Sequence, residues 1–214
     1  MQISVLTINR YPNPNYLSQT LEGLAGYVFT IFLGNGNLSH IPPGHHVVMP
    51  SLDDIFKLQA YPSPTQRHAF NMHRILCSSD DSLLFLEDDI LLTDDFFFHL
   101  PNLIEQAQGE HGERFVLNLF DSRVQKRGVP DLETEPSGGF GTPAVYFGSK
   151  ARTLLREHSY GHYVECRQTN CGLDIFLRRE AYAQGIPMLR PSTRIISHIG
   201  HVSTGCQGIE KQVR

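Results

Sequence analysis

The stretch SLLFLEDDILL, residues 82–92, decides the fold. Its first half is a continuous apolar run, which is typical of a strand buried on both faces within a parallel sheet. Glu87, Asp88 and Asp89 then follow together, although mutual repulsion and lost hydration both oppose the burial of carboxylates. The central question raised by the sequence is which partner compensates these three charges.

Strand-like and helix-like segments alternate along the chain on both sides of this stretch, without an internal repeat. The patterns predict strands at 3–8, 27–34, 46–49, 82–87, 114–120, 144–148 and 193–199, and helices at 16–26, 65–77, 94–108, 149–159 and 173–184. This alternation predicts a single α/β domain, 1–214, with a mostly parallel central sheet flanked by helices. Ligands of such sheets bind beyond the carboxyl ends of the strands, where the acidic cluster lies.

The composition excludes several classes of protein. A net charge of −4 gives no reason to expect nucleic acid as a partner. No segment approaches the roughly 20 apolar residues of a membrane span, and the first residues lack the features of a signal peptide. We therefore expect a cytoplasmic protein without an integral membrane segment. The four cysteines lack zinc-like spacing; Cys166 and Cys171 could form a disulfide, but reduced thiols are the simpler expectation.

Two interpretations of the acidic cluster are open. In the first, the cluster is structural, and Asp88 or Asp89 caps the segment after the strand. In the second, it binds a divalent cation such as Mg²⁺ or Mn²⁺, which prefers oxygen ligands and often takes only one or two carboxylates beside substrate phosphates. Because successive strand residues point to opposite sides, one aspartate could reach the metal while its neighbour meets a sugar hydroxyl.

Other polar residues lie where a nucleotide could bind. Thr7 lies near the end of the first strand and Arg10 follows it, and neither a dinucleotide-binding GxGxxG nor a P-loop motif is present there. The helix before the acidic strand carries Arg67, Asn71 and Arg74 at helical spacing. All three are candidate donor-binding residues, and Arg67 or Arg74 could meet a pyrophosphate. A solvated basic face is the alternative.

The segment SHIGHVSTG, residues 197–205, places two histidines beside a turn of small residues. His198, at the end of the last predicted strand, could supply a metal ligand from far along the chain, and His201 is less favoured. An ordinary loop histidine is the alternative for both.

In combination, these motifs resemble the metal-dependent nucleotide-sugar glycosyltransferases of the GT-A (Rossmann-like) fold. The matching segments are, in order, ISVLTINRY, QRHAFNMHRIL, LFLEDDI, GGFGTPAVYF, NCGLDIFL and SHIGHVSTG. Within that fold the chain is most similar to the N-acetylglucosaminyltransferase IV type, which has a similar EDD strand and late His-Ile/Val-Gly element. The resemblance implies a nucleotide-binding half, 1–89, and an acceptor and catalytic half, 90–214.

The resemblance also implies a metal site and a donor site. Residues 87–89 match the family's DXD-type motif, with Asp89 as the direct ligand of Mn²⁺ or Mg²⁺ and Asp88 nearer the ribose or sugar. Glu87 belongs to the same donor-binding motif. His198 matches the metal-binding histidine near the carboxyl terminus of many members.

Further residues take roles by the same resemblance. Thr7 and Arg10 line the nucleotide pocket. Gly138 and Gly139 let the backbone approach the donor sugar, although they could simply form a glycine-rich turn. Asp174, at the start of a predicted helix, is the catalytic base, with an ordinary role at the helix terminus as the alternative.

The implied function is transfer of a sugar, with GlcNAc as one candidate, from a UDP-sugar to a hydroxyl of a glycan, lipid or protein acceptor. An inverting reaction needs one carboxylate to take the proton of the acceptor hydroxyl, and Asp121 is the second candidate for this base. A phosphohydrolase or nuclease using residues 87–89 is one alternative, and a non-catalytic nucleotide-sugar-binding domain is another. A sugar nucleotidyltransferase is disfavoured because a glycine-rich phosphate loop does not follow the first strand. The polar loop 121–143 is expected to cover the donor or to form part of the acceptor site, with a surface insertion as the alternative.

Overall fold

The central element of the structure, a computed structural model, is an eight-stranded sheet. The model describes residues 1–8, 15–35, 38–61, 64–121, 124, 128–134, 141, 143–157 and 173–200, without the side chains of 64–65 and 173–175. In spatial order the strands are β3 (Val47–Val48), β2 (Thr30–Leu33), β1 (Gln2–Thr7), β4 (Leu83–Glu87), β8 (Ala144–Phe147), β6 (Val116–Asn118), β9 (Met188–Pro191) and β7 (Leu132–Thr134). Four of the seven pairings between these strands are parallel, which confirms the predicted α/β fold with a mostly parallel sheet.

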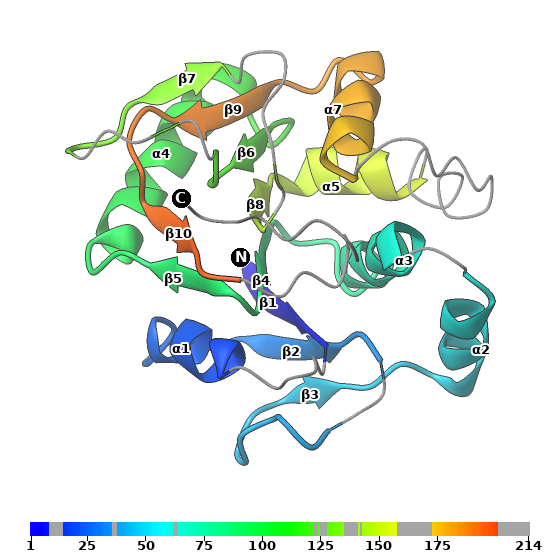
Figure 1. The fold of residues 1–214 in the computed structure, drawn as a ribbon. Coiled ribbons are helices and arrows are strands. Elements are labelled where there is room, and N and C mark those ends of the chain that lie inside the picture. Colours follow the sequence, from blue (N-terminus) through cyan, green and yellow to red (C-terminus); the bar gives the residue numbers. More distant parts are fainter. Residues whose placement is uncertain are drawn as a thin grey trace, which may run out of the picture.

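Helices cover both faces of the sheet (Figure 1). They are α1 (Tyr16–Glu22), α2 (Leu52–Ala60), α3 (Pro64–Leu76), α4 (Phe96–His111), α5 (Ser149–Leu155) and α7 (Leu173–Ala183). The side chains of α2, α3, α5 and α7 pack in one hydrophobic cluster, and those of α1 and α4 pack in the other. Among the described residues, no helix is long and apolar enough to cross a membrane.

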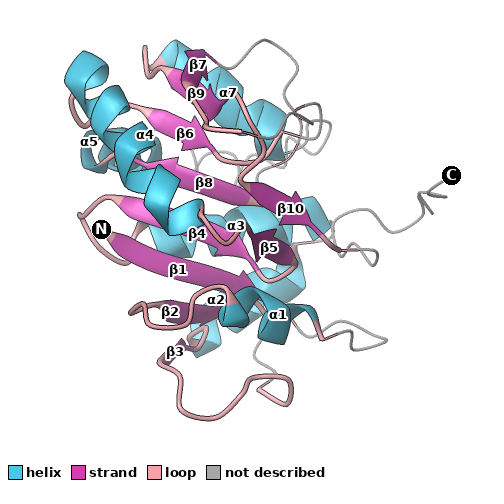
Figure 2. Cartoon of the chain, turned by 90° about the vertical axis from the view of Figure 1, so that its left-hand side faces the viewer, coloured by secondary structure: helices cyan, strands magenta, loops and turns pink. Residues whose placement is uncertain are grey.

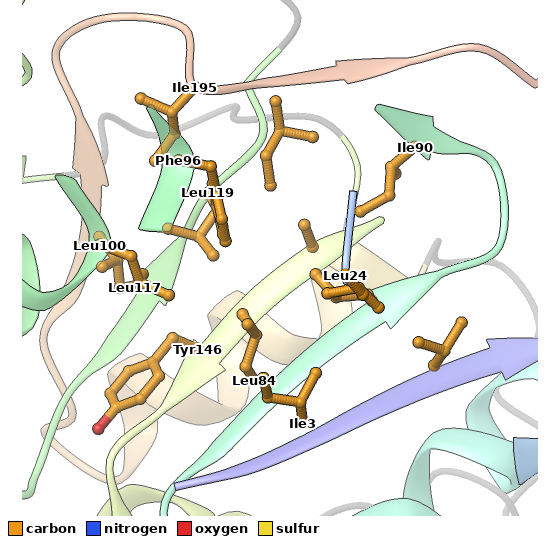
Figure 3. Packing of buried hydrophobic residues seen from close by; sticks show 14 of the residues in the cluster. Ile3, Leu24, Leu84, Ile90, Phe96, Leu100, Leu117, Leu119, Tyr146 and Ile195 are labelled. Atoms are coloured by element: carbon orange, nitrogen blue, oxygen red, sulfur yellow. The ribbon is translucent and has the colours of Figure 1, made fainter. Parts of the chain in front are cut away.

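The apolar run of β4 reflects this arrangement. Leu83 and Phe85 belong to the cluster under α3, whereas Leu84 and Leu86 belong to the cluster under α4. All four side chains are 0% exposed, because both faces of the strand are covered. Figure 3 shows the second cluster, where Leu84 lies beside Ile3 of β1.

Several elements differ from the sequence-based expectation. Helix α2 was not predicted, although Ser51 and Asp54 form a capping box in which each side chain bonds the other residue's backbone N–H. Strand β9 was also missed, and β7 lies within the segment predicted as a continuous loop, 121–143. Strand β8 runs antiparallel to its neighbours, a direction that its short apolar sequence does not encode.

The strand directions define one carboxyl edge for the site. Strands β1, β2 and β4 are mutually parallel. Strand β6 points the same way as β4, because β8 is antiparallel to both. A separate two-stranded sheet lies beyond the ends of β1 and β4 (Figure 2) and pairs β5 (Ile90–Leu92) with β10 (Ile196–His198). This pairing places the last described part of the chain beside the acidic cluster.

The opposite edge of the sheet is anchored by Arg152 of α5, which is 0% exposed. Its guanidinium donates to the carbonyls of Ile75 (2.7 Å), Leu76 (2.9 Å) and Asp81 (2.7 Å). Two of these carbonyls belong to the last turn of α3, where backbone acceptors have no partner within the helix. Burial lowers the pKa of Arg152 to about 10, so the side chain remains charged at neutral pH.

Candidate functional site

The acidic cluster and the late histidine meet at the carboxyl edge. Asp89 Oδ2 lies 3.2 Å from His198 Nε2, although the two residues are 109 positions apart. Residues Ile90 and His198 are paired in the β5–β10 ladder, and the amide of Ile199 donates to the carbonyl of Asp89 at 2.8 Å. The Asp89 side chain is 4% exposed and that of His198 is 36% exposed. The pair therefore joins a buried carboxylate to an accessible imidazole.

Gly200 packs directly against this pair, which leaves no room for a side chain there. A Cβ added there would overlap Asp89 Oδ2 and would lie 2.9 Å from Asp89 Cγ and 3.0 Å from His198 Nε2. A side chain at this position would have to displace one of the two groups. The absence of a side chain at Gly200 is thus a requirement for the Asp89–His198 geometry.

Asp88 points toward β1 and is held by a different set of partners. Thr7 Oγ1 lies 2.5 Å from Asp88 Oδ2 and 2.9 Å from His40 Nε2. Thr7 is 0% exposed and Asp88 is 3% exposed. Asp88 and Asp89 lie in the turn between β4 and β5, beyond the alternation of the strand, and their carboxylates have different partners.

Glu87 makes a third set of contacts, on the face covered by α3. Its carboxylate lies 3.3 Å from His68 Nε2, and the His68 ring meets Phe85 edge-on. The Glu87 amide donates to the carbonyl of Pro143 at 2.7 Å. The three acidic side chains therefore have separate partners, which reduces the repulsion expected from the sequence.

The three polar residues of α3 hold the neighbouring backbone. Arg67 donates to the carbonyl of Tyr61 at 2.9 Å, and Asn71 donates to that of Gly34 at 3.2 Å. Arg74 donates to the carbonyl of Leu33 at 3.2 Å and to the Asn71 side chain at 3.0 Å. The contacts of Asn71 and Arg74 fasten α3 to the end of β2, and that of Arg67 joins it to the residue after α2. Donor binding by these three residues stays a prediction.

An ion pair extends this region to α2. Arg74 Nε lies 3.2 Å from Asp54 Oδ2. Burial lowers the pKa of Arg74, and the Asp54 carboxylate only partly opposes this shift. Burial raises the pKa of Asp54, but hydrogen bonds from Ser51 and the charge of Arg74 outweigh it, so the pKa lies below the ordinary value.

Asp121, the second candidate base, lies after β6 and is paired with Arg190 of β9. Arg190 Nη1 and Asp121 Oδ2 are 2.6 Å apart, and the Asp121 side chain is only 1% exposed. A second nitrogen of Arg190 reaches Glu133 at 3.1 Å. A carboxylate held this way by a guanidinium is a poor proton acceptor. The pair joins β6, β9 and β7.

The structure does not describe the side chains of several other predicted site residues. Arg10, Gly138 and Gly139 lie outside the described residues, as do His201, Cys166 and Cys171. Asp174 lies in the first turn of α7, where the backbone is described and its side chain is not.

The position of α7 follows from its connection to β9. Met188, the first residue of β9, pairs with Val116 at the start of β6, far from the carboxyl edge. Only residues 184–187 join α7 to β9, so the helix ends near that opposite edge. The 11 residues of α7 span about 16 Å, which directs its first turn back toward the carboxyl edge.

The donor set of the site fits a hard divalent cation. Asp89 offers a carboxylate oxygen and His198 an imidazole nitrogen. Within the part of the chain that the structure describes, three or more metal-binding side chains do not gather at one point. Magnesium and manganese sites often use one or two protein ligands and complete the shell with phosphates and water. The two-ligand set therefore suits an ion that arrives with a diphosphate.

Sequence reasoning missed three residues at this edge. His40 lies in the connection from β2 to β3, His68 lies within a helix, and Gly200 lies in the late histidine segment. Single histidines in loops or helices give no distinctive pattern. Gly200, however, stands two residues after His198, a predicted metal ligand. Its position near the site could therefore have been inferred from the sequence.

Comparisons with known proteins support the fold. No protein-family model matches the sequence, and no curated protein matches it. Among solved structures, similarity was found to a mannose-1-phosphate geranyltransferase from Thermus thermophilus, with a TM-score of 0.50 and 15% identity over 92% of this chain and 75% of that chain. A glycosyltransferase involved in glycosylation of the major capsid of PBCV-1 has a TM-score of 0.50 and 11% identity, with 95% of each chain covered.

At these identities the similarity shows the fold alone. The chain has a single α/β domain with a mostly parallel sheet flanked by helices, and a solved glycosyltransferase of nearly equal extent shares this architecture. The chain is thus an α/β domain whose fold is similar to that of a solved glycosyltransferase, with a carboxylate–imidazole pair at its carboxyl edge.

Proposed function

We propose that the protein is a metal-dependent glycosyltransferase that moves a sugar from a UDP-sugar to a hydroxyl of a glycan, lipid or protein acceptor. The observation that carries this proposal is the 3.2 Å approach of Asp89 Oδ2 and His198 Nε2 at the carboxyl edge. Ligands of α/β sheets bind at this edge. The shared architecture of a solved glycosyltransferase supports the same function.

In this proposal Asp89 and His198 hold Mn²⁺ or Mg²⁺. A bound cation would neutralise the charge that develops on the leaving diphosphate. Asp88, held by Thr7, would face the ribose or the sugar. Thr7, Arg10 and the polar residues of α3 are proposed to support the nucleotide side, and Gly138 and Gly139 the sugar.

Asp174 is the proposed general base. Its carboxylate would accept the proton of the acceptor hydroxyl as that oxygen forms a bond to the anomeric carbon and the diphosphate leaves. This reaction inverts the anomeric centre. The proposal is supported by the direction of α7, which begins toward the carboxyl edge. The ion pair between Asp121 and Arg190 disfavours Asp121 for the same role.

The proposed function is tested by UDP release from a panel of UDP-sugars, with and without Mn²⁺. UDP-GlcNAc is tested first, because the motifs resemble those of N-acetylglucosaminyltransferases. We expect Mn²⁺-dependent release from one donor by slow hydrolysis, without a known acceptor. Asp89→Asn should lower this rate by about two orders of magnitude, because it removes a charged metal ligand.

A matched control is available on α4. Asp95 Oδ2 and His99 Nε2 form another carboxylate–imidazole pair, 3.0 Å apart, which belongs to no part of the proposed site. Asp95→Asn should leave the Mn²⁺-dependent rate unchanged. If no donor is hydrolysed and calorimetry shows no Mn²⁺-dependent binding of UDP, the proposed function is wrong.

A further inference from the structure

A chain of hydrogen bonds connects three segments behind the proposed donor site. Thr7 ends β1, Asp88 follows β4, and His40 lies in the connection from β2 to β3. Thr7 Oγ1 is 2.5 Å from Asp88 Oδ2 and 2.9 Å from His40 Nε2. Because Thr7 is 0% exposed, its hydroxyl is not accessible to a ligand and can act on one only through its neighbours.

The chemistry of these groups fixes the direction of the chain. The Thr7 hydroxyl donates its single proton to Asp88 Oδ2. The Thr7 oxygen must then accept from His40, which requires a proton on His40 Nε2. The order is therefore His40 N–H to Thr7 O–H to the Asp88 carboxylate. Hydrogen bonds in such a series polarise and strengthen one another.

We propose that His40 is a positioning residue, which acts through Thr7 to orient the Asp88 carboxylate for the donor nucleotide sugar. This inference rests on the proposed function, because it assumes that Asp88 meets the donor. Thr7 thus has a different task from direct contact with the nucleotide. Its hydroxyl transmits the position of His40 to a carboxylate that lies next to the proposed metal ligand Asp89.

The arrangement has a functional consequence for Asp88. Without the Thr7 hydroxyl as a hydrogen-bond donor, the Asp88 carboxylate can adopt other rotamers. Its conformational entropy is then lost when the nucleotide sugar binds, which weakens that binding. Changes in residues that orient a ligand-binding group generally reduce affinity or activity by about 10- to 100-fold. Loss of His40 weakens the contact between Thr7 and Asp88 indirectly, because His40 acts through its contact with Thr7. The effects of His40 and Thr7 should not add, because both act on Asp88 in series.

The direction of the chain is tested by long-range ¹H–¹⁵N NMR of the full chain labelled with ¹⁵N-histidine. The His40 signal is assigned by its loss in His40→Gln. We expect a protonated Nε2 at neutral pH in the absence of any ligand. An unprotonated Nε2 would accept the Thr7 proton, which would remove it from Asp88, and this result would overturn the proposal.

The positioning role is tested by calorimetry of UDP binding in the presence of Mn²⁺. We expect Thr7→Val and His40→Ala each to weaken binding by about 10-fold or more, with the double variant no weaker than Thr7→Val. His40→Gln retains an N–H donor and Thr7→Ser retains the hydroxyl, so both should bind within about threefold of wild type. Thermal melting confirms that each variant is folded. Additive losses, or unchanged binding by His40→Ala, would overturn the positioning role.

The chain offers a matched control for these changes. Thr30 Oγ1 and His46 Nδ1 form another threonine–histidine contact, at 3.3 Å, where β2 begins. Thr30→Val and His46→Ala should leave UDP binding unchanged. If the wild type binds no UDP with Mn²⁺, the proposed function fails, and the proposed role of His40 in donor binding is overturned with it. In that event the NMR measurement still determines the direction of the hydrogen-bond chain.

Discussion

Replacement of Gly200 by alanine is the sharpest test of the Asp89–His198 geometry. The added Cβ would overlap Asp89 Oδ2 and lie 2.9 Å from Asp89 Cγ, whereas ordinary van der Waals contact begins at 3.4 Å. Asp89 Cγ must therefore retreat by about 0.5 Å, and its oxygen by more. Metal ligands tolerate deviations of about 0.2 Å, so the pair can no longer hold one ion in its original geometry. We expect Mn²⁺-dependent UDP binding to fall by about 10- to 100-fold.

The assay is calorimetric titration of UDP with saturating Mn²⁺, accompanied by circular dichroism to establish folding. The phi angle of Gly200 lies outside the left-handed region, so alanine imposes no backbone strain there. Gly109→Ala in α4 is the matched control, because a Cβ at Gly109 would meet nothing within 4 Å. It should preserve UDP binding and raise stability by up to about 1 kcal/mol, as expected for alanine in a helix. Wild-type UDP affinity in Gly200→Ala would refute the argument that Gly200 keeps the pair in place.

Three further changes test the supports of the fold by chemical denaturation. Arg152→Met should reduce the free energy of unfolding by about 3–5 kcal/mol, because it removes the donor to buried carbonyls at the end of α3; a loss below about 1 kcal/mol contradicts this role. Asp54→Ala should cost about 1–2 kcal/mol at pH 7, through the lost capping box and the lost contact with Arg74. Because the pKa of Asp54 is lowered by folding, this difference should diminish as pH falls below 3.8, and a pH-independent difference is the contrary result. Arg190→Met should cost about 3 kcal/mol, since it removes the guanidinium beside the buried Asp121, and unchanged stability would contradict that.

The layered fold was predictable because its main signal is local. The continuous apolar run that ends at Glu87 requires a strand covered on both faces, and the structure confirms this coverage. Helix α2 could also have been predicted, since Ser51 and Asp54 have the spacing of a capping box. The direction of β8 could not, because four apolar residues satisfy a parallel or an antiparallel ladder equally well.

The site, like the fold, was only partly predictable from the sequence. The resemblance to glycosyltransferases predicted Asp89 and His198 as metal ligands, and the β5–β10 pairing places their side chains 3.2 Å apart. Their role in metal binding stays a prediction. The contact between His40 and Thr7 depends on how a loop folds back over β1, a long-range arrangement without a sequence pattern. The role of Gly200 depends on atomic distances, which sequence spacing does not provide.

The most direct test of the central claim is pulsed electron paramagnetic resonance of Mn²⁺ bound to the protein with UDP. If His198 is a ligand, its imidazole nitrogen should produce a ¹⁴N modulation of the Mn²⁺ signal. This modulation should be present in the wild type and absent in His198→Ala, and Asp89→Asn should weaken Mn²⁺ binding in the same titration. Bound Mn²⁺ and UDP without any ¹⁴N modulation in the wild type would contradict the claim that Asp89 and His198 jointly hold the cation.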